Sequence, residues 1–271
     1  MKEQVLESPF CKKEFLDLVD IVSEVKTTKL ANYAISDSSI VNIGDRDFVD
    51  YRPDIFIDPQ VLKDNNISSI SFDSLHFFQV QNLVEEIDTK SIKIKKSDVA
   101  VNLILPKTYE EYLESLTKKN RHELKRKKRK FDNETTSCEL GESKEQDIFD
   151  IFISQHRESK GEKGEFMTEV VETYFRNLLN LQGWKIYYTN TDKGVLSTAF
   201  CYENDDGCYL YNSSRNNEFN SINPGIVLND LIIQQLILRG MAFFDFLKGT
   251  ERYKYDLGGN SVQLYDLAIE L

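Results

Sequence analysis

Apolar residues from about residue 106 onward recur first at helical spacing. Three segments that begin near Thr108, Ser143 and Thr168 place apolar residues three or four positions apart, which predicts amphipathic helices. Thr108 and Ser143 each have Glu or Gln three positions later, the spacing of a capping box at a helix N-terminus. The first segment, which becomes increasingly basic, is expected to stay helical to about Phe131.

The apolar period changes to two after the third helical segment. Three runs alternate or are apolar throughout, and segments rich in Asn, Asp and Gly separate them. This pattern predicts an antiparallel meander of three strands. The three runs are 184–189, 195–203 and 208–214.

The segment after the meander is typical of a buried helix followed by a buried strand. Residues 226–239 are apolar over most of the helix surface, with Asn223 and Pro224 before them and Gly240 after them. These are the residue types that favour the beginning and the end of a helix. Residues 242–247 then predict a buried strand, and 262–269 predict a closing strand.

The first 104 residues carry a weaker mixture of signals and no recognisable catalytic set. A helix is expected from Phe15 to Val25. Short strands are expected at 39–43, 67–72, 77–80, 91–94 and 99–105. We therefore expect two domains, 1–104 and 105–271, with the chemistry in the second.

Charge is distributed unevenly along the chain. The formal net charge is -11, which argues against general nucleic-acid binding, DNA included, because a protein that binds duplexes needs a field that neutralises phosphates. Residues 118–130 nevertheless contain nine Lys or Arg and a single acid, Glu123. The basic run is therefore expected to act locally.

Metal binding and membrane insertion are not expected from the sequence. The four cysteines show no CxxC spacing and the three histidines show no HxxxH spacing, so we expect reduced thiols and no metal. No window approaches the ~20 apolar residues of a membrane span, and the first residues lack the apolar core of a signal peptide. The expected location is the cytoplasm.

Residues in three regions match the motifs of a known family. They resemble the GNAT superfamily, in particular its cellulose-biosynthesis-type acetyltransferase branch, and more distantly the Fem peptidoglycan aminoacyltransferases. Asp50, Tyr51 and Asp58 resemble a further short motif of the family. The matching residues are Leu105, Pro106, Tyr112, Leu113, Leu116, Lys119, Asn120, Arg121, Leu124, Lys125 and Arg126; then His156, Lys160, Gly161 and Phe166; then Asn223, Pro224, Gly225, Gly240, Phe244, Asp245, Phe246, Leu247, Lys248, Gly249, Glu251, Tyr253 and Lys254.

The resemblance implies an α+β protein with the GNAT fold and a mixed central sheet. A complete GNAT unit would follow a reduced GNAT-like N-terminal lobe. The implied activity is transfer of an acyl group from acetyl-CoA or another acyl-CoA to a small-molecule, sugar or envelope-precursor acceptor. The glycine-rich pyrophosphate loop of ordinary acetyltransferases is absent, which leaves the donor open.

The donor is expected at the beginning of the 226–239 helix. Free N–H groups and the positive end of the helix dipole bind phosphate there. The residues assigned to the donor are Asn223, Gly225, Ile226, Val227 and Tyr211. An Asn-Pro-Gly tripeptide is also simply a good helix beginning, so the sequence leaves both interpretations open.

Five residues are candidates for proton transfer, one of which is Tyr211, a candidate proton donor as well as a donor-binding residue. Asp245 lies among apolar residues, where a carboxylate is costly unless it is paired, and Lys254 is its possible partner. Tyr253 is a candidate proton donor and His156 a candidate general base. A purely structural role for Asp245 is given equal weight with catalysis.

Arg121, Lys160 and Glu251 complete the candidate site as substrate-binding residues. The basic run raises the expectation that Arg121 contacts an anionic ligand. Two alternatives stay open beside acyl-CoA-dependent transfer. One is a Fem-like transferase that uses aminoacyl-tRNA, and the other is a non-catalytic GNAT-like module that docks an anionic partner or a membrane surface.

Overall fold

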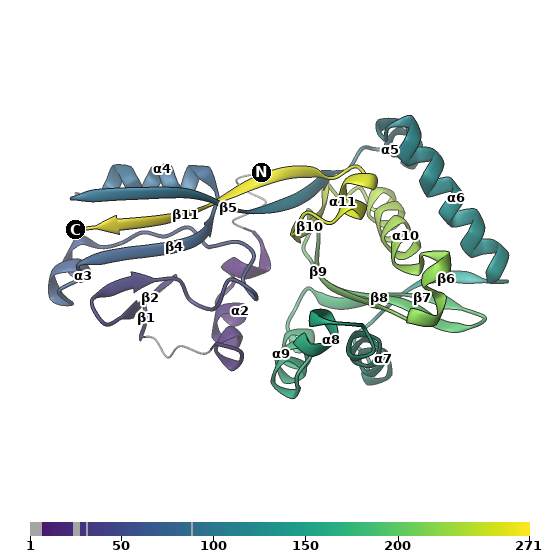
Figure 1. Ribbon diagram of the computed structural model, residues 1–271, viewed down its shortest axis with the longest axis horizontal. Helices are drawn as coiled ribbons and strands as arrows, with labels where there is room; N and C mark the ends of the chain where they lie inside the picture. The colour runs from purple at the N-terminus through teal and green to yellow at the C-terminus, as the bar shows by residue number, and fades with distance from the viewer. Residues whose placement is uncertain (1–6, 24–27, 31, 88) are drawn as a thin grey trace. The chain divides into compact units, whose positions relative to one another are not determined.

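The computed structural model describes residues 7–23, 28–30, 32–87 and 89–271. The chain forms two compact units, Met1–Ala100 with Ser261–Leu271, and Val101–Asn260. Each unit contains both helices and strands (Figure 1). Each is described below by itself.

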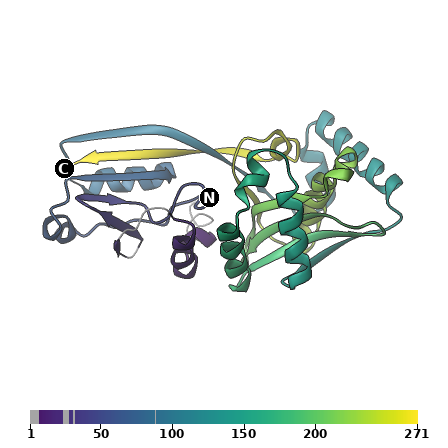
Figure 2. The same ribbon diagram turned by 60° about the horizontal axis from the view of Figure 1, so that its bottom comes forward.

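The first unit contains a sheet in the strand order β1-β2-β3-β4-β11-β5. β3 pairs with β4 in parallel, while β1–β2, β2–β3 and β4–β11 are antiparallel. β5 and β11 lie side by side as two long strands (Figure 2). The elements are α2 Lys13–Leu18, β1 Thr28–Leu30, β2 Tyr33–Ser36, β3 Ser39–Val41, α3 Pro59–Asp64, β4 Ser69–Leu75, α4 Phe77–Glu86, β5 Ser91–Ile104 and β11 Asn260–Glu270, with 3-10 turns at Pro9–Cys11 and Val19–Ile21.

The strand predicted at 77–80 is wrong, because this segment begins helix α4. His76 and Gln79 form a reciprocal capping box, and Val80 and Leu83 are buried one turn apart. The two strands predicted between 91 and 105 are one strand, β5. Helix α2 with the following 3-10 turn covers part of the helix predicted from Phe15, whose residues 24 and 25 lie outside the described residues.

The second unit contains the strands β10-β9-β8-β7-β6 in that order. β6 to β9 are antiparallel, which confirms the predicted meander, and β9 pairs with β10 in parallel. Strand β6 was not predicted, because only two of its six side chains, Cys138 and Leu140, are apolar. The elements are α5 Tyr109–Ser115, α6 Lys118–Glu134, β6 Cys138–Ser143, α7 Gln146–Arg157, α8 Glu162–Phe166, α9 Glu169–Asn180, β7 Trp184–Thr191, β8 Gly194–Glu203, β9 Gly207–Arg215, the 3-10 turn Asn217–Ile222, α10 Pro224–Leu238, β10 Phe243–Lys248 and α11 Arg252–Asp256.

The helical stretch predicted up to Phe131 is interrupted. It consists of α5 and α6, and Leu116 and Thr117 separate them. Thr117 has extended backbone angles, and its side chain accepts a hydrogen bond from the N–H of Asn120, so it acts as the N-cap of α6. The basic run nevertheless lies within one continuous helix, as predicted.

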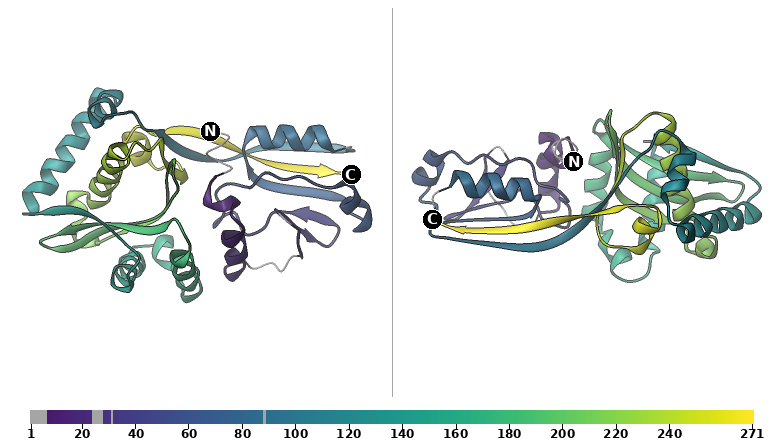
Figure 3. Two further views of the ribbon diagram at one scale, coloured as in Figure 1. Left: turned by 180° about the vertical axis from the view of Figure 1, so that it is seen from behind. Right: turned by 90° about the horizontal axis from the view of Figure 1, so that it is seen from above.

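Helices cover both faces of the sheet in the second unit. α10 packs over β8 and β9, while α7 and α9 lie against the opposite face (Figures 1 and 3). α10 is apolar nearly all round, and residues such as Ile232, Ile233 and Leu236 are fully buried. This packing fixes the N-terminus of α10 beside the carboxyl end of β9.

Candidate functional site

The parallel strands β9 and β10 separate before they end. Their paired residues stop at Asp245 opposite Tyr209, although β10 continues to Lys248 and β9 to Arg215. Leu247 has a φ of 59°, an unusual conformation for a residue with a bulky side chain, so β10 bends at this point. Carboxyl ends of strands are where open sheets bind ligands.

A cavity of about 370 Å³ lies at the N-terminus of α10. It brings together four residues that the sequence assigned to the site, Asn223, Gly225, Ile226 and Tyr253. The full lining is Lys127, Thr198, Ser213, Arg215, Asn220, Asn223, Gly225, Ile226, Leu228, Asn229 and Tyr253.

The N-terminus of α10 offers one free N–H to this cavity. The carbonyl oxygen of Asn223 accepts hydrogen bonds from the N–H groups of Ile226 and Val227, at 3.1 and 3.3 Å. Asn223 has left-handed backbone angles, and its side chain does not cap the helix. Among the described residues, the Gly225 N–H has no acceptor. A Cβ at Gly225 would meet no atom within 4 Å, so a ligand can reach this backbone closely.

Sequence reasoning missed several polar residues of this lining, among them Arg215, Lys127 and Asn229. Arg215 lies at the end of β9 and donates to the side chain of Asn220 at 2.6 Å. Lys127 reaches the cavity from α6. Asn229 is only 5% exposed, and in the described part of the chain no group hydrogen-bonds to its side-chain amide. Its position one helical turn after Gly225 is the sequence signal that could have identified it.

Asp245 and Lys254 both hold the bend after β10. The Asp245 carboxylate, in a residue 1% exposed, accepts the Leu247 N–H at 2.8 Å. The Lys254 ammonium donates to the carbonyl oxygens of Leu247 (3.4 Å), Gly249 (3.3 Å) and Lys248, and pairs with Glu251 at 3.0 Å. These contacts support a structural role, and a catalytic role for either residue stays a prediction.

His156 and Tyr253 keep their neutral forms near pH 7. Burial of the His156 ring lowers its pKa to about 4, nearby Lys163 adds to this, and Nε2 lies 3.0 Å from the Asn212 side-chain oxygen. Burial and the Glu251 carboxylate raise the pKa of Tyr253 well above its usual value. Tyr253 therefore carries a proton where it lines the cavity.

Lys163, which the sequence did not single out, has a lowered pKa and interacts electrostatically with His156. The residue is exposed at the surface, but surrounding protein atoms and Arg215 lower the pKa of its ammonium to about 8, partly opposed by Glu251. A substantial neutral fraction of this amine is therefore present just above neutral pH.

Four further predicted residues lie outside the cavity lining. Val227 is buried in the hydrophobic core. The hydroxyl of Tyr211 lies 3.1 Å from that of Tyr174. Arg121 donates to the carbonyl oxygen of Leu113 at 3.2 Å, and Lys160 is exposed. Their assignments to donor and substrate stay predictions.

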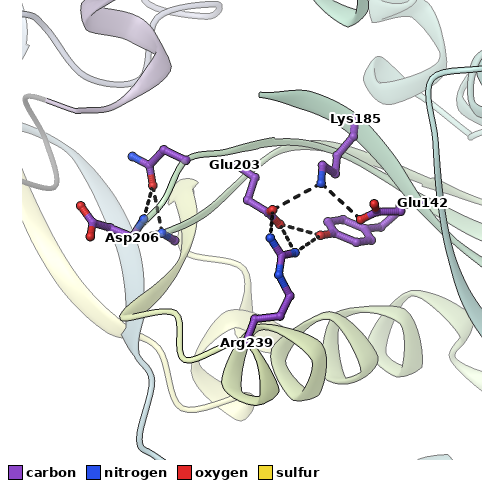
Figure 4. Close-up of polar contacts among 8 residues, drawn as sticks. Glu142, Lys185, Glu203, Asp206 and Arg239 are labelled. Atoms are coloured by element: carbon purple, nitrogen blue, oxygen red, sulfur yellow. Dashed lines mark hydrogen bonds and ion pairs between the residues drawn. The ribbon is translucent and has the colours of Figure 1, made fainter. Parts of the chain in front are cut away.

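A polar network holds the other end of α10 (Figure 4). The buried Glu203 carboxylate accepts hydrogen bonds from Arg239 and Tyr187, each at 2.5 Å, and pairs with Lys185 at 3.3 Å. Lys185 also pairs with Glu142 at 3.2 Å. The bonds and charges around Glu203 hold the pKa of its carboxyl below its usual value despite burial. The network ties the C-terminal end of α10 to β7 and β8.

Metal ligation and membrane crossing find no support in the described residues. They contain no cluster of three or more His, Cys, Asp or Glu side chains placed to hold a metal ion. None of their helices has the length and apolar character needed to cross a membrane.

Comparisons with known proteins agree with this architecture. Residues 118–255 match the family described as the acetyltransferase (GNAT) domain. A search of the curated proteins found no match. Among solved structures, a conserved protein of unknown function from Bacteroides thetaiotaomicron has a TM-score of 0.62 at 10% identity, covering 99% of this chain and 96% of that one. FemX has a TM-score of 0.58 at 12% identity, covering 89% and 82%.

At these identities the solved structures bear on the fold alone. They support the α+β class with a mixed sheet that the sequence predicted. The family match spans α6 to α11 and so includes the α10 cavity, the separated strands and the bend held by Lys254. The chain therefore belongs to the family of GNAT acetyltransferase domains.

Proposed function

We propose that the protein is an acyl-CoA-dependent N- or O-acyltransferase that binds the pyrophosphate of its donor in the α10 cavity. The observation that carries this proposal is the free N–H of Gly225 at a helix N-terminus, because Gly225 lines a cavity together with two cations, Arg215 and Lys127. Among the described residues, no carboxylate lines the cavity. Helix dipole, backbone donor and cations all favour a phosphate group at the same place.

The gap between β9 and β10 suits the remainder of the donor. Beyond Tyr209, the edge of β9 that faces β10 no longer pairs with it, so an extended chain containing amide groups can add to that edge. Asn229 has an unused side-chain amide on the adjacent face of α10. We assign Asn229 to the donor's pantetheine amides, because its side chain offers both a hydrogen-bond donor and an acceptor, and a buried amide without partners is costly.

Tyr253 is the proposed proton donor. Attack of an amine or hydroxyl on the thioester carbonyl forms the new C–N or C–O bond, breaks the C–S bond and leaves a thiolate that needs a proton. Tyr253 is protonated at neutral pH and lines the cavity. The nucleophile must also lose a proton. The proposed acceptor is Lys163, which lies outside the cavity lining but interacts electrostatically with Arg215 of that lining and has a pKa of about 8.

The nature of the acceptor substrate follows from the resemblance alone. A small molecule, a sugar or an envelope precursor with a free amine or hydroxyl is the proposed class.

Calorimetric titration tests the donor site. CoA and pantetheine, which lacks the pyrophosphate, are titrated into the protein and into its Arg215→Gln variant. We expect the variant to bind CoA at least tenfold more weakly and pantetheine equally well, since a charged hydrogen bond contributes ~1.5–3 kcal/mol. Arg129→Gln, at an exposed cation on α6, is the matched control. Equal CoA affinity in wild type and Arg215→Gln would remove Arg215 from the donor site.

A further inference from the structure

A second concave surface lies between α6 and α11. This α6 groove has a volume of about 980 Å³ and is separate from the α10 cavity except at Lys127, which lines both. Its lining is Lys118, Lys119, Asn120, His122, Glu123, Arg126, Lys127, Arg129, Arg252 and Asp256.

The α6 groove is strongly positive even though the chain as a whole is acidic. Six Lys or Arg residues line it against two carboxylates. Both carboxylates already have partners, since Glu123 accepts two bonds from Arg126 at 2.7 and 2.9 Å and Asp256 lies 3.6 Å from Arg252. With a net charge of -11 over the chain, anions are repelled elsewhere and attracted here.

Several cations of the groove are unused. Within the described residues, Lys118, Lys119 and Arg129 have no ion-pair partner, and all three side chains are exposed. Lys119, His122, Arg126 and Arg129 follow one another at intervals of three and four positions, so they form one stripe along the helix, in which Arg126 is paired with Glu123. The stripe is about 15 Å long at a rise of about 1.5 Å per residue.

The length and the composition of the stripe limit what it can bind. A single phosphate engages one or two cations, whereas a stripe of this length is filled by a ligand whose negative charge repeats. A membrane surface fits less well, because amphipathic helices that bind membranes carry apolar anchors. No large hydrophobic side chain among the described residues of α6 or α11 is exposed.

We propose that the α6 groove is a docking site for the phosphodiester backbone of a polynucleotide strand. The contacts are to phosphates, so binding is expected to be tolerant of sequence and steeply dependent on salt. Because Lys127 lines both surfaces, a strand in the groove would lead to the edge of the α10 cavity. The proposal does not depend on the donor assigned to that cavity.

Fluorescence anisotropy with labelled single-stranded RNA and DNA 12-mers tests the proposal. The groove variant combines Lys118→Glu, Lys119→Glu and Arg129→Glu, which replace unpaired exposed cations and should leave the melting temperature unchanged. The control variant combines Lys93→Glu, Lys95→Glu and Lys96→Glu, which make the same charge change at exposed positions of β5. Phosphatidylglycerol vesicles and polyglutamate are tested in parallel.

We expect wild type and the control variant to bind the 12-mers alike and the groove variant to bind at least tenfold more weakly. The plot of log affinity against log salt has a negative slope, and its magnitude should decrease by ~2 in the groove variant, because each phosphate of a single strand that the protein no longer neutralises reduces the magnitude by ~0.7. Stronger binding of RNA than DNA, or the reverse, identifies the natural strand. Equal losses in both variants, an unchanged affinity in the groove variant, or binding of vesicles or polyglutamate as tight as that of the 12-mers would each overturn the proposal.

Discussion

Replacing Lys254 by Met separates the structural and the chemical interpretations of this residue. Lys254 is 2% exposed, and its ammonium serves three carbonyl groups of the bend after β10. Met keeps most of the apolar stem and loses a similar side-chain entropy on folding, so the substitution removes little besides the charge and its hydrogen bonds.

The expected loss of stability follows from which carbonyl groups water can reach. Leu247 is buried, so its carbonyl oxygen would lose its donor without replacement, whereas Lys248 and Gly249 are partly exposed and water can replace the ammonium there. An unsatisfied buried group costs ~1–3 kcal/mol, and a bond to a charged group contributes ~1.5–3 kcal/mol. We therefore expect Lys254→Met to lower the free energy of unfolding by about 2–4 kcal/mol.

Urea unfolding followed by circular dichroism measures this change. With an m value of ~2 kcal/mol per M, the midpoint should fall by about 1–2 M. Lys160→Met is the matched control, because Lys160 is exposed and should change stability by less than ~0.5 kcal/mol. A Lys254→Met protein with unchanged stability but a hundredfold slower acyl transfer would refute the structural interpretation and support a role in chemistry.

Three further predictions concern other parts of the second unit. Glu203→Gln should lower the free energy of unfolding, measured in urea, by about 2–4 kcal/mol, because it leaves Arg239 without its buried carboxylate. The affinity of the folded variant for CoA should not change. Burial lowers the pKa of His156 from 6.5 to about 4, so the unfolded chain binds a proton at a higher pH than the folded protein does. This contribution to stability should therefore be lost as pH falls from about 6.5 to about 4. The free energy of unfolding, measured at several pH values in this window, should depend less on pH for His156→Asn than for wild type. If Lys163 accepts the nucleophile's proton, the rate of acyl transfer should rise with pH to a plateau above about 8, and Lys163→Met should remove that rise.

Periodicity was sufficient to predict the elements that are amphipathic or buried. The meander, the buried α10 and the buried β10 follow from apolar spacing, since each must present an apolar face to the same core. The segment at 77–80 was mistaken for a strand because four residues with two aromatics fit either period, and the His76 capping box that settles it uses an unusual N-cap residue. β6 has only two apolar side chains, too few to predict a strand, so its pairing with β7 depends on the neighbouring strand rather than on its own sequence.

Some residues of the candidate site could likewise be predicted from the sequence, and others could not. Asn223 and Gly225 were predicted because helix beginnings have a local signature, and they line the cavity. Arg215 and Asn229 were not predicted, because their importance comes from where β9 ends and which face of α10 meets the cavity. A buried Lys such as Lys254 looks catalytic in a sequence, and its three carbonyl partners appear only in the folded bend.

The affinity of CoA for a Gly225→Val variant tests the donor site most directly. The added side chain meets no protein atom at its Cβ and replaces a glycine in the first turn of α10, so the melting temperature without ligand should be kept or slightly raised. It would stand where the donor's phosphate approaches the Gly225 N–H, so calorimetry should show CoA binding at least tenfold weaker and pantetheine binding unchanged. A folded Gly225→Val protein that binds CoA as tightly as wild type would contradict the placement of the pyrophosphate at the N-terminus of α10.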